Sequence, residues 1–232
     1  MDKTVVIHQP DFLSYLGFFH RLLQADLYIV LDDVQYVKGT SQSWMNRDKI
    51  KTQNGEQWLT VNIKKAPTGT KINEILLNDT LNWKKKNLDL LTQNYRKAPY
   101  FDEIYPYLED LYSKECDNLS EFNMESIYML NKLFDITIDI VFSSSLKSTT
   151  TKSERLVELL KQVDATHYLS GVGARDYHDD EPFDRAKIQV LWQEFTHPIY
   201  EQLHGDFIPY LSSIDLLFNC GIEKSRKILR GI

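Results

Sequence analysis

The sequence predicts an α/β fold with a central, mainly parallel sheet. Two apolar runs near the N-terminus, residues 4–7 and 27–31, lack polar alternation, which is typical of strands buried on both faces. The segment between them, residues 16–23, places apolar side chains at helical spacing. A strand, a helix and a second strand in this order predict a right-handed βαβ unit whose two strands are parallel.

An antiparallel hairpin and a helical insertion are predicted after this unit. Residues 43–50 and 57–65 flank Asn54-Gly55, which is a strong hairpin turn signal. Helical spacing then continues over about residues 83–134, so we expect a helical insertion there. Further strands and helices are predicted at residues 136–142, 152–163, 167–169, 188–192, 213–218 and 223–229. Because no repeat and no clear linker is present, residues 1–232 are expected to form a single α/β domain.

Charge, apolar runs and cysteines limit the class of protein. Lys and Arg number 27 against 33 Asp and Glu, a net charge of -6, so no global basic field favours nucleic acid. No apolar run approaches the length of a membrane span, and the N-terminus lacks a secretory signal pattern. Cys116 and Cys220 belong to no CxxC motif and are expected to be free thiols. We therefore expect a cytoplasmic protein with neither a membrane nor a nucleic acid as its partner.

Polar residues follow the first two predicted strands where each strand ends. His8-Gln9 comes after the first strand, and Asp32-Asp33 comes after the second. Because ligands bind outside the carboxyl ends of the strands in an open α/β sheet, these side chains predict a small-molecule site. His8 can bind phosphate, orient a substrate or transfer a proton near neutral pH, and a His that only caps its loop is the alternative. Adjacent strand residues point to opposite faces, so Asp32 and Asp33 are not expected to form a dyad, and a solvated turn is their alternative role.

A glycine-containing loop follows a later short strand. It reads Ser170-Gly171-Val172-Gly173-Ala174-Arg175. Glycines let backbone N–H groups approach a ligand, so this loop can cradle an anion. It matches neither the Walker loop nor the dinucleotide fingerprint, and a plain turn is the alternative.

Three residues of the predicted hairpin are also candidates for ligand binding. Trp44, Asn46 and Arg47 lie in one predicted strand, and the Arg47 guanidinium can bind phosphate or carboxylate with two donors. Strand alternation places Trp44 and Asn46 on one face and Arg47 on the other. An ordinary hairpin with a solvated polar face is the alternative.

Polar and aromatic residues also crowd together near the C-terminus, at His197, Tyr200, Gln202 and His204. A metal site needs convergent ligands, and the two histidines are too far apart for the helical pair that binds zinc. We therefore predict no metal site.

Many short motifs, in the same order along nearly the whole chain, resemble the WbqC-like family. In the N-terminal half they are Ile7-His8-Gln9-Pro10, Leu16-Gly17-Phe18-Phe19, Leu31-Asp32-Asp33-Val34-Gln35-Tyr36, Asn46-Arg47 and Trp58-Leu59-Thr60-Val61. In the C-terminal half they are Tyr168-Leu169-Ser170-Gly171, His197-Pro198-Ile199-Tyr200, Leu211-Ser212 and Asp215-Leu216-Leu217-Phe218-Asn219. One departure is that Ser14 and Tyr15 stand where relatives often have proline and tryptophan.

The resemblance implies a function in surface polysaccharide biosynthesis, such as that of lipopolysaccharide O-antigen. Members of the family are associated with gene clusters of this kind, often beside enzymes of nucleotide-linked amino sugars. The implied reaction is acyl or aminoacyl transfer to the amine of such a sugar. On this hypothesis His8, His197 and Asp33 act in catalysis. The substrate contacts are then Gln9, Asp32, Gln35, Trp44, Asn46, Arg47, Ser170, Gly171, Gly173, Arg175, Tyr200 and Gln202.

Two other functions stay open at the level of the sequence. One is an ATP-dependent ligase that activates an amino acid as its adenylate, and the other is a non-catalytic sugar-nucleotide-binding protein of the same pathway. The residues specify no cofactor, no acyl donor and no oligomeric state. A charged tRNA as the aminoacyl donor is the one nucleic acid that the hypothesis admits.

Overall fold

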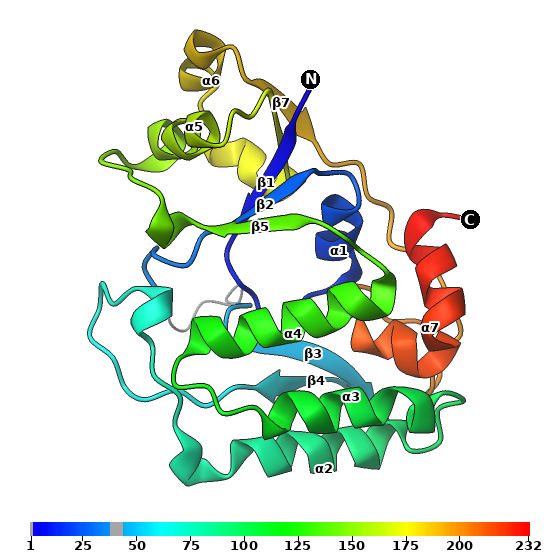
Figure 1. The fold of residues 1–232 in the computed structure, drawn as a ribbon. Helices are drawn as coiled ribbons and strands as arrows, with labels where there is room; N and C mark the ends of the chain where they lie inside the picture. The colour runs from blue at the N-terminus through cyan, green and yellow to red at the C-terminus, as the bar shows by residue number, and fades with distance from the viewer. Residues whose placement is uncertain (1, 38–43) are drawn as a thin grey trace. The chain divides into compact units, whose positions relative to one another are not determined.

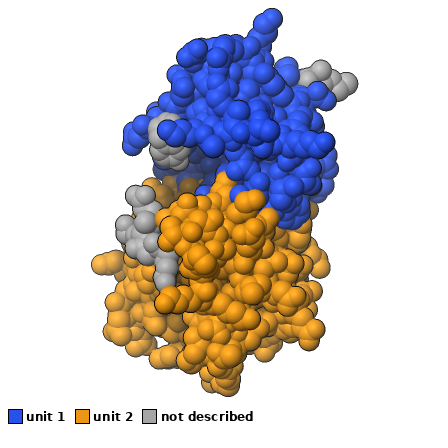
Figure 2. Space-filling view, turned by 90° about the vertical axis from the view of Figure 1, so that its left-hand side faces the viewer, with its two compact units in different colours: residues 1–9, 20–33, 137–196 blue, residues 10–19, 34–136, 197–232 orange. Residues whose placement is uncertain are grey.

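The computed structural model describes residues 2–37 and 44–232, apart from the side chain of Tyr177 (Figure 1). Within them the chain forms two compact units (Figure 2). Unit 1 contains the N-terminal segment to Gln9, residues 20–33 and residues 137–196. Unit 2 contains residues 10–19, 34–136 and 197–232. The expectation of a single domain stays a prediction.

Unit 1 is built on a five-stranded sheet in which every strand pair is parallel. The strands are β1 (Thr4–His8), β2 (Leu27–Val30), β5 (Asp139–Phe142), β6 (His167–Ser170) and β7 (Gln189–Trp192). Their order is β5-β2-β1-β6-β7, and Val5 is in register with both Leu27 and Tyr168. The predicted α/β class with a parallel central sheet is confirmed. The chain builds outward from β1 in one direction and then from β6 in the other, so the strand order reverses between β1 and β6.

Both faces of this sheet are covered, which explains the unbroken apolar runs in the sequence. On one face, Val5 and Ile7 belong to a buried cluster with helices α5 (Lys152–Gln162) and α6 (Glu181–Ala186). Val6 points to the other face and is also fully buried. Apolar side chains on both faces of β1 therefore fix the strand in the centre of the sheet.

Unit 2 contains the predicted hairpin, which is shorter than expected. Strands β3 (Arg47–Thr52) and β4 (Gly55–Thr60) pair antiparallel, with Arg47 opposite Thr60. The tight turn consists of Gln53 and Asn54, and Gly55 takes the positive φ of +96°. Met45 and Asn46 form a bend, so β3 begins only at Arg47. Residues 38–43, and with them the predicted start of the strand at residue 43, lie outside the described residues.

Helices form the rest of unit 2. The predicted insertion is observed as α2 (Trp83–Tyr95), α3 (Phe101–Ser113) and α4 (Leu119–Phe134). The two closing helices of the prediction are one helix, α7 (Ile214–Arg230), with a kink at Gly221, whose φ of 72° is not helical. Helix α1 (Leu16–Leu22) begins in unit 2 and ends in unit 1. Among the described residues, none of the helices has the length and apolar character that crossing a membrane requires.

Candidate functional site

The carboxyl ends of the five parallel strands bring several predicted residues to one edge of unit 1. His8 ends β1, Asp32 and Asp33 follow β2, and Ser170 ends β6. The reversal of strand order between β1 and β6 marks the point at which open α/β sheets bind ligands. His8 and Ser170 stand on either side of this switch point, and Gly171 follows directly.

His8 is held in a defined tautomer by its own loop. Its Nδ1 atom lies 2.8 Å from the carbonyl oxygen of Gln9. Because a carbonyl oxygen only accepts hydrogen bonds, Nδ1 carries the proton and the lone pair of the neutral ring is on Nε2. The hydroxyl of Tyr28 donates to the carbonyl oxygens of His8 (3.2 Å) and Gln9 (3.3 Å), which fixes the backbone at this point. Gln9 thus contributes its carbonyl oxygen to the arrangement.

Arg21 is the residue of this edge that the sequence analysis did not select. It lies in the last turn of α1 and is only 5% exposed. Its Nε atom is buried without a hydrogen-bond partner, and no carboxylate among the described side chains pairs with the guanidinium. Arginine is almost never fully buried unless it is paired, so this cation is a candidate partner for an anionic ligand. Burial, and then the charge of Arg21, lowers the pKa of His8 from 6.5 to about 3, which keeps the imidazole neutral.

The sequence did contain a signal for Arg21. Phe18, Phe19 and Leu22 are all buried, so apolar side chains surround the arginine on a helix of only seven residues. A charged residue on a helix that is apolar nearly all round has no solvated face to occupy.

Gly171 makes room for the guanidinium of Arg21. A Cβ atom on residue 171 would lie 2.6 Å from Nη1 of Arg21, well inside van der Waals contact. Gly173, two residues on, has nothing within 4 Å of the same position. Of the two predicted glycines, therefore, only Gly171 is required by the packing of this edge. Arg175 is exposed, and its Cζ atom lies 5.1 Å from the ring centroid of Trp192, at the end of β7.

Asp32 and Asp33 have protein partners. Asp32 is buried and accepts hydrogen bonds from the Ser144 hydroxyl (2.7 Å), the Ser144 N–H (3.0 Å) and the Ser143 hydroxyl (3.1 Å). Asp33 contacts the same Ser143 hydroxyl and pairs with Arg155 of α5 at 2.5 Å. Partial burial acts against ionisation of Asp33, but the hydrogen bonds from Ser143 and Arg155 outweigh it and lower its pKa.

The expectation that the two carboxylates point apart was wrong. Both converge on Ser143. Strand β2 ends at Val30, and Asp33 lies in a bend, so the alternation of strand side chains does not extend to them. Their predicted contacts with substrate stay a prediction, as does the catalytic role of Asp33.

The hairpin candidates lie in unit 2. Arg47 places Cζ 4.2 Å above the ring centroid of Trp58, and the Trp44 ring lies 5.4 Å from the same ring. The prediction that Trp44 and Arg47 occupy opposite faces was therefore wrong, because the chain bends before Arg47. Asn46 accepts from the Tyr36 hydroxyl at 3.0 Å and donates to the carbonyl of Val61 at 3.1 Å. Gln35 pairs as an isolated bridge with Lys71.

Tyr200 and Gln202 hold a buried carboxylate of unit 2. The Tyr200 hydroxyl (2.9 Å) and Gln202 Nε2 (2.8 Å) donate to Oδ2 of Asp215, which is fully buried, and the Tyr95 hydroxyl donates to Oδ1 at 2.7 Å. These contacts give both residues a structural task. His197 repeats the arrangement of His8, with Nδ1 2.9 Å from the Pro198 carbonyl oxygen and a pKa lowered by burial.

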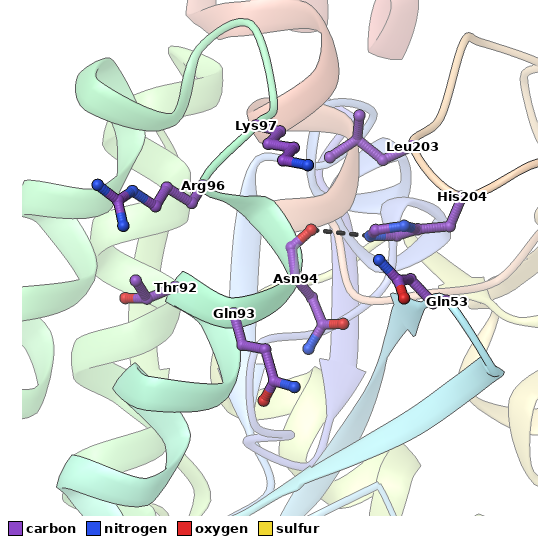
Figure 3. Close-up of a pocket in the computed structure, with 8 residues that line it drawn as sticks. All are labelled: Gln53, Thr92, Gln93, Asn94, Arg96, Lys97, Leu203 and His204. Carbon is purple, nitrogen blue, oxygen red and sulfur yellow. Dashed lines mark hydrogen bonds between the residues drawn. The ribbon is translucent and has the colours of Figure 1, made fainter.

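A cavity of about 460 Å³ lies elsewhere on unit 2 (Figure 3). The hairpin turn, the end of α2 and residues 203–204 line it, and His204 Nε2 lies 2.8 Å from the Asn94 carbonyl oxygen. Its two cations, Arg96 and Lys97, are exposed and hydrated. None of the predicted site residues lines this cavity. A desolvated cation attracts an anion more strongly than a hydrated one, so we favour the edge of the unit 1 sheet as the site.

Comparison with known sequences agrees with the motifs. The sequence model of the WbqC-like protein family matches residues 9–227. The chain belongs to this family. The WbqC-like chain is also similar to an uncharacterized protein of Mycobacterium tuberculosis (strain ATCC 25618 / H37Rv), Rv1507c, with 37% identity over 224 residues, which is 95% of each chain. No solved structure matches the WbqC-like chain.

Within residues 2–37 and 44–232, no three side chains of His, Cys, Asp or Glu are grouped so that they could hold a metal ion. Arg21 is the buried cation of the unit 1 edge, and Arg175 is an exposed one. An anionic group on a small molecule is the partner that this charge fits.

Proposed function

We propose that the WbqC-like chain binds a nucleotide-linked amino sugar at the carboxyl edge of unit 1 and transfers an acyl or aminoacyl group to the sugar amine. One observation carries the proposal, namely the buried Arg21 guanidinium whose Nε has no partner, at the switch point of the sheet. A buried donor without a partner costs about 1–3 kcal/mol, and more when it is charged. A phosphate oxygen matches the donors of a guanidinium and offsets its charge.

His8 is the proposed base of the transfer. The amine nitrogen attacks the carbonyl carbon of an activated donor, either a thioester or an ester. The new C–N bond forms as the C–S or C–O bond to the leaving group breaks. Nε2 of His8 takes the proton that the amine loses and returns it to the leaving thiolate or alkoxide, so the ring ends neutral as it began.

The bound phosphate also makes His8 a better base in this proposal. In the ligand-free protein, burial and the Arg21 charge hold its pKa at about 3, too low for efficient proton abstraction at neutral pH. An anion on Arg21 cancels part of the positive charge that His8 experiences, and the pKa of His8 rises. The base is therefore strongest when substrate is present.

The choice of a nucleotide-linked amino sugar comes from the family resemblance. Family members are associated with surface polysaccharide gene clusters, and their nucleotide sugars carry the diphosphate that Arg21 fits. The residues of this chain support two features at this edge, namely an anionic ligand on Arg21 and a proton acceptor at His8. Surface polysaccharide biosynthesis is therefore the proposed setting of the reaction.

The test begins with binding to the full-length protein. Thermal unfolding is followed with UDP- and dTDP-linked amino sugars and, separately, with ATP and Mg²⁺, because a ligand of the native state raises its stability. We expect the sugar nucleotides to stabilise the protein. Arg21→Met should abolish that response, and the matched control Arg185→Met, at an arginine exposed on α6, should keep it. Stabilisation by ATP alone would instead support the adenylating ligase.

Turnover is then measured by mass spectrometry with acyl thioesters and with charged tRNA as donors. The expected product is the sugar nucleotide with its mass increased by one acyl or aminoacyl group, and its yield should fall at least tenfold in His8→Gln. If sugar nucleotides bind but no donor gives this product, the catalytic part of the proposal fails and the non-catalytic binding protein is the better hypothesis.

A further inference from the structure

We infer that the β7 side of the unit 1 edge is a nucleobase subsite, in which the base stacks on Trp192 beside the guanidinium of Arg175. The inference deepens the proposed function and depends on it, since the nucleotide's diphosphate is taken to lie on Arg21. The sequence analysis assigned neither Trp192 nor Arg175 to the binding of a nucleobase. The ligand class is a nucleoside diphosphate, free or sugar-linked.

The β2 side and the β7 side of the switch point differ in the side chains that a nucleoside could contact. On the β2 side, both oxygens of Asp32 are hydrogen-bonded to the serines after β5, and Asp33 is paired with Arg155. A ribose hydroxyl bound there would have to displace an existing partner. Asp32 and Asp33, which follow β2, thus already have partners within the protein. We therefore place the nucleoside on the side of β6 and β7.

On the β7 side an aromatic ring is already held in place. The Trp192 ring contacts the His178 ring edge-on at 5.0 Å, and His178 stacks on Phe183 at 4.8 Å. Phe183 in turn stacks on Tyr168 at 5.6 Å, with an interplanar angle of 6°. This row of rings supports Trp192 from within the unit, while the indole itself stays partly exposed. A ring fixed before binding loses little entropy when a base stacks on it.

Arg175 completes the subsite from the solvent side. Its guanidinium is 5.1 Å from the Trp192 ring centroid, and the residue is exposed. Nucleobases stack both on aromatic side chains and on guanidinium planes, so the pair presents two planar surfaces of the right kind. A saturated sugar ring can pack its C–H face on an indole, but it has no π face to stack on a guanidinium plane. This chemistry favours a base over a sugar at this position.

The positions of Arg21 and Trp192 define a path across the sheet edge. Trp192 is in register with Ser170, which shares a face with Tyr168 and α6. His8 follows Ile7, which faces α5 and α6, so the His8 side chain points to the opposite face. A nucleoside diphosphate that reaches both groups must cross the edge at Gly171. Apart from the chain neighbours of Gly171, the only described atoms within 4 Å of its Cβ position belong to the Arg21 guanidinium, which is the proposed partner of the diphosphate.

The test compares a nucleoside diphosphate with the anion alone. Affinities of the full-length protein for UDP and for inorganic pyrophosphate are measured by calorimetry in the wild type, Arg21→Met, Trp192→Ala, Trp192→Phe and the control Arg185→Ala. We expect UDP to bind at least tenfold more tightly than pyrophosphate. Trp192→Ala should remove that preference without weakening pyrophosphate binding, Trp192→Phe should keep most of it, and Arg185→Ala should keep all of it. UDP should also quench tryptophan fluorescence in the wild type but not in Trp192→Phe.

The outcomes separate this inference from the proposed function. If pyrophosphate binds and depends on Arg21, but UDP binds no more tightly, the nucleobase subsite is overturned and the anion site stands. The same conclusion follows if Trp192→Ala weakens UDP and pyrophosphate equally, because the ring would then act only on the fold. If neither ligand binds the wild type, the proposed function fails and the subsite fails with it.

Discussion

Nη1 of Arg21 lies 2.6 Å from the point where a Cβ atom on Gly171 would be. The contact joins the last turn of α1 to the loop after β6, at the switch point of the sheet. The size of the residue at position 171 therefore determines where the Arg21 guanidinium can lie. A methyl group there would move the guanidinium, because the end of a flexible side chain yields before the backbone does.

Gly171→Ala is therefore expected to weaken anion binding about tenfold, which corresponds to about 1.4 kcal/mol. The free energy of unfolding should change by less than about 0.5 kcal/mol, because only the end of the Arg21 side chain has to move. Calorimetric titration with pyrophosphate measures the first quantity and urea unfolding the second. Gly173→Ala is the matched control, since its Cβ atom would meet nothing within 4 Å. Equal affinity in the two variants would contradict the prediction that Gly171 positions the anion-binding guanidinium.

Arg21→Met is expected to make the ligand-free protein more stable. Replacing a buried, unpaired cation by an apolar side chain of similar length removes a desolvation cost, and we expect a gain of about 1–3 kcal/mol. Urea unfolding in a buffer free of phosphate and sulfate measures it. Added pyrophosphate should stabilise the wild type but not the variant. A loss of stability in the variant would mean that the guanidinium supports the fold rather than a ligand.

Because of His8, the free energy of unfolding is expected to depend on pH at acidic pH values. Its pKa is about 3 in the folded protein and 6.5 when unperturbed, so below about pH 6.5 the unfolded state binds more protons than the native state. Its contribution is complete above that value and is lost as the pH falls toward about 3, with a slope that approaches about 1.4 kcal/mol per pH unit. Unfolding is compared at several pH values in the wild type and His8→Gln. The free-energy difference between them should change over this range, and pyrophosphate should reduce the change. A constant difference would contradict the prediction.

Tyr200→Phe is expected to act on the fold of unit 2. It removes one of the donors to the buried Asp215 carboxylate, and the loss should cost about 1–3 kcal/mol of unfolding free energy. Pyrophosphate affinity should not change. Tyr128→Phe, at a tyrosine that is 42% exposed, controls for loss of a hydroxyl in unfolding experiments. A stable Tyr200→Phe variant with impaired turnover would instead restore Tyr200 to the predicted substrate site.

The parallel sheet and the hairpin could be predicted because the information is local. Unbroken apolar runs at β1 and β2 indicate strands covered on both faces, and Asn54-Gly55 indicates a tight turn. The rule that ligands bind at strand ends then selected His8 and Ser170. The apolar residues around Arg21 on its helix were a signal for it, but the burial of its unpartnered Nε atom is seen only in the structure. The engagement of Asp32 and Asp33 by Ser143 and Arg155 was equally out of reach, since more than a hundred residues separate the partners.

The chain passes between the two units five times, after residues 9, 19, 33, 136 and 196. No single cut of the polypeptide can therefore release either unit whole. A fragment that ends at Ile136 would lack β5, β6 and β7, and with them one side of the switch point. During synthesis, the edge of β1 that pairs with β6 stays unpaired until β6 has been made, because more than 150 residues separate the two strands. Dissection of this protein by truncation is thus expected to give aggregation-prone fragments with unpaired strand edges, and point substitutions are the better instrument.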